Sequence, residues 1–378
     1  MRRITIKDIA REAGVSPGAA SFALNDRPGV SEQTRERVKR VAAELGWTRS
    51  AAAAALSGRR AKALGLVLQQ AAGDDYAEAF VMRFMAGVQQ VLRPLGQSLV
   101  LQIVTSHEEE LATYRTWWGE QRVDGVLLLR PREADGRPEL LAELGMPGVV
   151  IGAPIADHIG SVCADESTTT RMLTEHLTDL GHRTVAYVTG PEERYYVQWR
   201  SATFREVCAE RGVTARVVNL DSADELSGSQ ATQRLVRSPG APTGIIFDNE
   251  LLAMGGVAAC HDSGLQVGRQ VAMAAFEDSP ACRMQRPAIS ALRRHSDALG
   301  SMAAQDLLAI IDGAEPTLRL APLPELAVRG SSGAPRHPSD AERPDDTASH
   351  AGLAGLATVA APAPALPPSP AASAAAVR

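Results

Sequence analysis

Short apolar runs alternate with longer amphipathic stretches between residues 63 and 276, and this alternation leaves few folds open to the chain. Runs such as ALGLVLQ, DGVLLLRP and GIIFD are typical of strands that are buried on both faces of a parallel sheet. We expect strands at 63–69, 98–104, 124–131, 147–153, 184–190, 215–220, 244–248 and 270–276, and helices at 80–95, 111–121, 167–180, 199–211, 229–236 and 251–263. Two successive sets of this kind predict two α/β lobes with doubly wound parallel sheets and a cleft between them.

The first 46 residues carry the capping and turn signals of three short helices. Thr5 with Asp8 three residues on forms a variant of the capping box, and Gly14 stands where a left-handed residue ends a helix. Ser16, followed by proline, starts the next helix, and a third helix follows a Ser31 cap. Two short helices joined by a tight turn predict a small all-α helix-turn-helix head. The alternative is a three-helix bundle that binds protein.

Charge is divided unevenly along the chain. Residues 1–60 hold 12 Lys and Arg against 6 Asp and Glu, whereas the remaining 318 residues hold 27 against 38. A basic head on an acidic body predicts that the head alone contacts a polyanion. No run approaches the roughly 18 apolar residues that a membrane span needs, so we expect no membrane partner and a cytoplasmic protein. The cysteine spacing fits neither a zinc site nor a disulfide framework and predicts four buried thiols, at Cys163, Cys208, Cys260 and Cys282.

Composition marks two further boundaries. Residues 47–60 contain five consecutive alanines, which favour a helix but are too few to form a stable one alone. From residue 331 onward there are 15 Ala and 8 Pro in 48 residues and no aromatic side chain, so this segment cannot bury enough apolar surface to offset its ordering entropy. We expect a helix-turn-helix domain at 1–46, a hinge helix or linker at 47–60, a two-lobed body at 61–332 and a disordered tail at 333–378.

The head resembles the DNA-binding domain of the LacI/GalR family of bacterial transcription regulators. The chain reads DIAREAGVS, SFALN, GVSEQTRERV and LGW in register with the family pattern. The resemblance implies that the helix from Ser16 to about Leu24 enters the major groove of double-stranded DNA. It also implies a set of polar residues that hold the head on the phosphates, namely Thr5, Ser16, Ser21, Asn25, Ser31 and Thr34.

The positions at which the family reads bases depart from the usual pattern. They fall at Pro17, Gly18 and Phe22, and none of these side chains can make the bidentate hydrogen bonds that distinguish G or A. Apolar contact of Phe22 and Ala19 with thymine methyl groups remains, together with DNA shape. We therefore expect an operator that is chosen more by deformability than by hydrogen bonds in the major groove.

In the family, the segment after the head folds on docking and pairs with that of its dimer mate in the minor groove, where a leucine wedge kinks the DNA. Leu56 and Ala53 match the wedge and its small neighbour, and Ser50 stands in place of the usual Asn. These three residues are therefore predicted to bind DNA. The alternative is a plain Ala-rich linker.

The body resembles the periplasmic-binding-protein-like core of the same family over roughly residues 63–332. Matching stretches include VDGVLLLRP, HLTDLGHRTVAYVTG, NELLAMGG and PAISAL, and the chain would cross between lobes near Gly160, Ser290 and Arg319. Strand ends would then face the cleft, where open α/β sheets bind ligands. The resemblance and these strand ends together predict an effector site made of Phe80, Arg130, Tyr196, Arg200, Asn249, Glu250, Phe276 and Glu277.

Three of these residues have purely structural alternatives. Arg200 could lie on the surface of a helix, Phe80 could belong to the core, and Glu250 could be a helix N-terminal acid stabilised by the macrodipole. Glu250 and Glu277 each stand where the family usually has Asp, and each adds one methylene to the reach of the carboxylate.

These features together predict a homodimer, or a higher oligomer, that represses transcription at a pseudo-palindromic operator under the control of a sugar-like effector. No phosphate loop, GxSxG elbow or HExxH motif is present, so we expect no enzyme activity, no cofactor and no metal site. Two alternatives remain: a soluble carbohydrate-binding protein that uses only the lobes, and a DNA-binding regulator whose effector pocket is vestigial.

Overall fold

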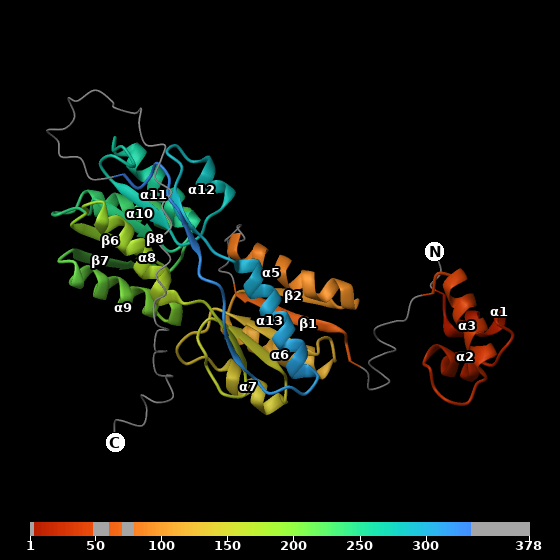
Figure 1. Cartoon of the computed structure of the whole chain (residues 1–378). Coiled ribbons are helices and arrows are strands. Elements are labelled where there is room, and N and C mark those ends of the chain that lie inside the picture. The colour runs from red at the N-terminus through yellow and green to blue at the C-terminus, as the bar shows by residue number, and fades with distance from the viewer. Residues whose placement is uncertain (1–3, 48–59, 70–78, 334–378) are drawn as a thin grey trace, which may run out of the picture. The chain divides into compact units, whose positions relative to one another are not determined.

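The structure is a computed structural model that describes residues 4–47, 60–69 and 79–333. The chain forms two compact units, Met1–Ala61 and Lys62–Arg378 (Figure 1). The predicted hinge residues Ser50, Ala53 and Leu56 lie outside the described residues, as does all of the predicted tail after residue 333. Within the described ranges, no helix is both long and apolar enough to cross a bilayer.

The head consists of the three predicted helices, α1 (Ile6–Glu12), α2 (Pro17–Leu24) and α3 (Glu32–Glu44). Thr5 and Asp8 form the capping box, and the Ser16 hydroxyl accepts the backbone N–H of Ala19 at 3.1 Å. Gly14 has φ +64°, the left-handed conformation that lets the chain turn tightly between α1 and α2. Small side chains fill much of the core, which consists of Ile9, Ala10, Ala13, Ala20, Ala23, Leu24, Val38 and Ala42. The predicted helix-turn-helix is confirmed.

We call the first half of the body lobe 1. Its strands are β1 (Ala63–Gln69), β2 (Ser98–Val104), β3 (Gly125–Leu129), β4 (Gly148–Ile151), β5 (Gly160–Cys163) and β11 (Leu318–Leu320). They form a parallel sheet in the order β11-β5-β4-β3-β1-β2. Its helices are α5 (Ala79–Leu92), which a 3₁₀ turn extends to Leu95, α6 (His107–Gly119), α7 (Arg137–Leu144) and α13 (Ser296–Ile311).

The second half of the body is lobe 2. Its strands are β6 (Thr184–Thr189), β7 (Thr214–Asn219), β8 (Gly244–Phe247), β9 (Ala272–Ala275), β10 (Ser290–Arg293) and β12 (Glu325–Ala327). The sheet order is β12-β10-β9-β8-β6-β7, and every strand is parallel to its neighbours except β12, which pairs antiparallel to β10. Its helices are α8 (Glu166–Asp179), α9 (Tyr195–Glu210), α10 (Glu225–Val236), α11 (Glu250–Asp262) and α12 (Pro280–Met284).

Three short segments join the lobes, each a few residues beyond a predicted crossover. They are residues 164–165 after β5, 294–295 after β10 and 321–324 between β11 and β12. The last helix, α13, therefore returns to lobe 1, where it lies beside α5 (Figure 1). Leu64 and Leu66 of β1 pack in the core cluster with these two helices, whereas Gly65 on the other face lies against Trp117 of α6. The predicted two-lobed α/β architecture is confirmed.

The structure departs from the expected elements in a few places. Helix α9 begins at Tyr195 rather than at residue 199, because the turn after β6 leads directly into it, and α6 begins four residues early after a Ser106 cap. Helices α7, α12 and α13 and the four short strands β5, β10, β11 and β12 were not expected. These strands have only three or four residues each, too few for a periodic pattern to show. The four cysteines are buried and unpaired, as predicted.

Candidate functional site

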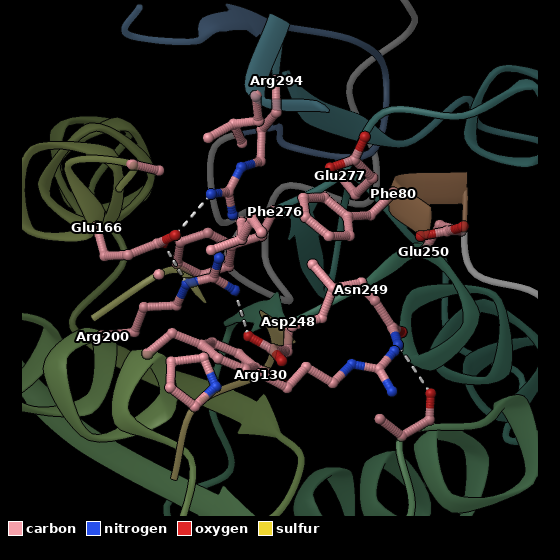
Figure 2. A pocket seen from close by; sticks show the side chains of 18 residues that line it. Phe80, Arg130, Glu166, Arg200, Asp248, Asn249, Glu250, Phe276, Glu277 and Arg294 are labelled. Carbon is pink, nitrogen blue, oxygen red and sulfur yellow. Dashed lines mark hydrogen bonds and ion pairs between the residues drawn. The ribbon is translucent and has the colours of Figure 1, made fainter. Parts of the chain in front are cut away.

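A cavity lies between the two lobes at the carboxyl ends of their strands (Figure 2). Leu129 ends β3, Ile151 ends β4, and Asp248 and Phe276 directly follow β8 and β9. Open parallel sheets place ligands at this edge, because loops from several strands converge there. The lining residues are Phe80, Leu129, Arg130, Pro131, Ile151, Gly152, Ala164, Glu166, Tyr196, Arg200, Ala223, Asp248, Asn249, Glu250, Phe276, Glu277, Arg294 and Leu299.

The electrostatic centre of the cavity is Arg200 on α9, whose side chain is almost completely buried. Its Nε donates to Glu166 Oε2 at 2.6 Å and its Nη1 donates to Asp248 Oδ1 at 2.5 Å. Arg294 donates to the other oxygen of Glu166 at 2.6 Å. Burial alone would raise the pKa of Glu166, but the two guanidinium groups outweigh it and lower that pKa to about 2. The buried charges therefore compensate one another.

Aromatic rings fix the orientation of the Arg200 guanidinium. Its Cζ lies 4.0 Å from the ring centroid of Phe276 and 4.9 Å from that of Tyr196, which are cation–π distances. The hydroxyl of Tyr187 donates to Asp248 Oδ1 at 2.7 Å, so this carboxylate is held by two donors. Arg200 is thus held by two ion pairs and two rings, and these contacts fix its position in the cavity.

Asn249 and Glu250 play structural roles at the start of α11. The Asn249 amide oxygen caps the helix by accepting the Leu252 N–H at 2.9 Å, and its amide nitrogen donates to the Ala223 carbonyl at 2.8 Å. Glu250, the first residue of the helix, is completely buried, and its Oε1 accepts the backbone N–H of Ala79 in lobe 1 at 3.0 Å.

Glu277 also faces lobe 1. Its Oε1 accepts from Arg83 Nη1 of α5 at 3.4 Å. Burial raises the pKa of Glu277, Arg294 opposes this, the nearby Glu250 adds to it, and the resulting pKa is about 8. The shift favours the protonated form of this carboxyl group, which can donate a hydrogen bond.

All eight residues predicted from the sequence line this cavity. Arg200 is not a surface residue, because it is only 4% exposed and doubly ion-paired. Phe80 serves both predicted roles in part, since it lines the cavity and stacks on Phe84 with a centroid distance of 6.1 Å. Glu250 does stand at a helix N-terminus, as the alternative predicted.

Sequence reasoning missed the two acids and the second arginine of the central cluster, Glu166, Asp248 and Arg294. Each directly follows a strand or a crossover, and the strand ending in GIIFD displays Asp248 in the sequence itself. A rule that collects charged residues at the ends of predicted strands would have found Asp248, but not Glu166 or Arg294, because β5 and β10 were not predicted. No set of three His, Cys, Asp or Glu side chains in the described part of the chain forms a metal-binding group.

The candidate DNA-reading surface is the outward face of α2. Pro17, Gly18 and Phe22 are exposed on it, Ala19 is partly exposed, and Ala20 and Ala23 face the core. Phe22 is 41% exposed, and its ring lies over Gly29 in the following loop. The three predicted base-reading positions therefore share one accessible face.

Most of the predicted phosphate-contacting residues lie at or near helix ends, whereas Ser21 lies within α2. Thr5, Ser16 and Ser31 are N-caps, and Asn25 at the C-cap of α2 donates to the Ser21 carbonyl at 2.8 Å. Thr34 lies 2.9 Å from the Ser31 hydroxyl. Backbone N–H groups at helix N-termini favour anions, so the caps of α2 and α3 suit phosphate contacts.

A helix-turn-helix head and a two-lobed body with a cavity between its lobes together define a DNA-binding transcription regulator that carries its own ligand-binding domain. Comparison with known proteins supports this assignment. Residues 5–50 match bacterial regulatory proteins of the lacI family, and residues 174–332 match the periplasmic binding protein-like domain. The HTH-type transcriptional regulator CelR of Thermobifida fusca is 30% identical over 319 residues, which span 82% of this chain and 93% of CelR. The chain belongs to the lacI family.

Two solved structures extend the comparison. The complex of the transcriptional regulator CelR with cellobiose is 27% identical, covers 87% of this chain and 100% of its own, and has a TM-score of 0.65. The lac repressor dimer bound to operator and the anti-inducer ONPF is 23% identical, covers 88% of this chain and 100% of its own, and has a TM-score of 0.76. The second likeness shows that the fold of head and body is shared.

Proposed function

We propose that this regulator is a homodimeric repressor that binds a pseudo-palindromic operator and is controlled by a neutral, sugar-like effector in the interlobe cavity. The observation that carries the proposal is the cavity itself, where compensated buried charges lie beside aromatic rings. The relative CelR, which was solved as a cellobiose complex, supports the choice of a carbohydrate.

The chemistry of the cavity favours a neutral ligand with several hydroxyl groups. Both oxygens of Glu166 already pair with arginines, and Arg200 already has two carboxylate partners, so neither calls for a charged ligand. Ordered carboxylates and guanidinium groups can each bind a hydroxyl as well. Phe80, Phe276 and Tyr196 offer flat apolar surfaces for the C–H face of a sugar ring.

The proposed control is a population shift between two arrangements of the lobes. A ligand that contacts both lobes binds the closed arrangement more tightly than the open one, and this difference in affinity is the free energy available to change DNA binding. We propose that the protein performs no chemistry on the ligand and acts in the cytoplasm, where bacterial DNA lies.

A thermal-shift panel of sugars, polyols and nucleosides tests the effector. A ligand present at about 100 times its dissociation constant adds roughly 2.7 kcal/mol of stability to the folded state. Replacing Phe80 by leucine removes one ring from the cavity and reduces the shift, whereas the same change at Phe22 in the head leaves it intact. A panel in which no compound raises the melting temperature would favour a vestigial pocket.

An electrophoretic mobility-shift assay with DNA from upstream of the gene tests whether the protein binds an operator there. We expect retardation at low salt that weakens as salt rises, because phosphate contacts release counterions. Retardation that persists equally with unrelated DNA would contradict sequence-specific binding.

A further inference from the structure

Two acidic side chains of lobe 2, Glu250 and Glu277, contact helix α5 of lobe 1. Glu250 on α11 accepts the N–H of Ala79, the first residue of α5, and Glu277 accepts from Arg83 one turn further along. Glu250 is fully buried and Glu277 is 4% exposed, whereas the Arg83 side chain is 35% exposed, so the Glu250 contact is the more deeply buried of the two. The Ala79 N–H therefore has its acceptor in the other lobe, 3.0 Å away.

The Glu250 side chain is directed to α5 and not to the charged centre of the cavity. Figure 2 shows its carboxylate beside the ribbon of α5, across the cavity from Arg200 and Glu166. Its neighbour Asn249 is occupied by the α11 cap and the Ala223 carbonyl. Asn249 and Glu250 therefore bind backbone groups of both lobes, the Ala223 carbonyl in lobe 2 and the Ala79 N–H in lobe 1.

Helix α5 cannot shift alone, because it crosses α13 at close range. A Cβ at Gly87 would overlap the Asp297 carbonyl, and a Cβ at Gly300 would overlap the carbonyl of Phe84. The two helices therefore move as one body. A contact that fixes the start of α5 fixes the packing of α13 as well.

We propose that Glu250 is the positioning residue that fastens helix α5 to lobe 2 and so sets the closed arrangement of the lobes that the effector recognises. This inference rests on the proposed function, since it assigns the regulation of the same cavity. Glu250 acts through Ala79 in this role.

Side-chain length is the critical property. Aspartate is shorter by one methylene, about 1.5 Å, so its oxygen would lie roughly 4.5 Å from the Ala79 nitrogen, beyond hydrogen-bonding range. Glutamine keeps the length and an acceptor oxygen but loses the charge. We therefore expect the hydrogen bond from the Ala79 N–H to residue 250 to be strongest with glutamate, weaker with glutamine and weakest with aspartate.

Hydrogen exchange of the Ala79 amide in the full-length, ligand-free protein tests the proposal, read by mass spectrometry with residue-level fragmentation. We expect Glu250→Asp to speed this exchange by about tenfold or more, the size of a charge-assisted hydrogen bond. Glu250→Gln should fall between Glu250→Asp and the wild type. The matched control is Glu225→Asp, which shortens the first residue of α10, an exposed glutamate in lobe 2.

Two results would overturn the proposal: Ala79 exchange in Glu250→Asp that equals that of Glu225→Asp, or Glu250→Gln exchange as fast as that of Glu250→Asp. If Glu250→Asp does not fold, Glu250→Gln provides the test. Exchange of the Ala79 amide that is unchanged in Glu250→Gln would contradict the proposal, because the charge of Glu250 would then not be needed to hold Ala79. The measurement uses no ligand. A failed effector panel therefore leaves this result standing, and a failed exchange test leaves the effector proposal standing.

Discussion

Arg200 is buried between two carboxylates and two aromatic rings, and such an ion cluster is costly to break. Replacing Arg200 by methionine keeps much of its volume. Among the described residues it leaves Asp248 with one of its two side-chain donors, Tyr187, and Glu166 with one of its two arginine partners, Arg294. We expect a loss of about 3–5 kcal/mol of unfolding free energy, because an uncompensated buried charge remains. Urea denaturation of the wild type and of Arg200→Met measures this difference in unfolding free energy.

Arg171 provides the control for that prediction. It pairs with Glu210 at 2.7 Å, but the two side chains are 37% and 48% exposed. Replacing Arg171 by methionine should cost less than about 1 kcal/mol. Equal losses at the two positions would show that the buried cluster contributes no more than a surface pair.

Glu277 makes stability depend on pH in the opposite sense to most carboxylates. Burial raises its pKa to about 8, against 4.5 for an ordinary glutamate, although Arg294 and Arg83 oppose the shift and Glu250 adds to it. The folded state holds this proton more tightly than the unfolded state. The stabilisation is therefore complete below pH 4.5 and is lost as the pH rises to about 8.

Melting temperatures between pH 5 and 8 check this linkage. The wild type should lose more stability over that interval than Glu277→Gln, which cannot ionise. Glu166 does not interfere, because its pKa of about 2 lies far below the interval. Parallel curves for the two proteins would contradict a raised pKa at Glu277.

Phe22 is the one large side chain at the predicted base-reading positions, and it is 41% exposed. It can contact thymine methyl groups but cannot hydrogen-bond a base edge. Phe22→Ala should therefore relax the preference for A·T pairs at the contacted positions while phosphate contacts hold affinity for unrelated DNA. Selection of binding sites from a random library, performed with both proteins, provides the measurement. Site preferences unaffected by the substitution would refute this mode of recognition.

At the scale of elements, α5 and α13 cross at close range at Gly87 and Gly300. A methyl group at Gly300 would meet the Phe84 carbonyl, which cannot yield without moving α5. Gly300→Ala should cost about 1–3 kcal/mol, although alanine favours helices. Gly119→Ala in α6, where nothing lies within 4 Å, should be neutral or stabilising. Chemical denaturation of both variants separates packing from helix propensity.

The elements that the sequence predicted well are those with local signals. Thr5, Ser16 and Ser31 cap helices through contacts within four residues, so the head helices could be placed almost to the residue. Strands β1 and β2 are long apolar runs and were also placed correctly. The edge strand β11 and helix α13 depend on a crossover that returns the chain to lobe 1, which no local pattern shows.

The same distinction holds for the cavity. The family resemblance and the strand ends identified eight of its lining residues. The pairing of Glu166, Arg200 and Arg294 joins segments that are 34 and 128 residues apart, so it could not be read from spacing. Glu250 was identified as a cavity residue, but its contact with Ala79 depends on how the two lobes meet.

For the whole molecule, the proposed coupling between cavity and operator must act in both directions. If a ligand from the thermal-shift panel changes operator affinity by some factor, operator DNA must change ligand affinity by the same factor, because both follow from one coupling free energy. Typical factors are about 5–150. We expect operator affinity from fluorescence anisotropy and ligand affinity from calorimetry to give equal ratios at protein concentrations that keep the dimer intact. If the ligand changes operator affinity but operator DNA does not change ligand affinity, the reciprocity fails. The ligand would then act by another route, such as a change of oligomeric state.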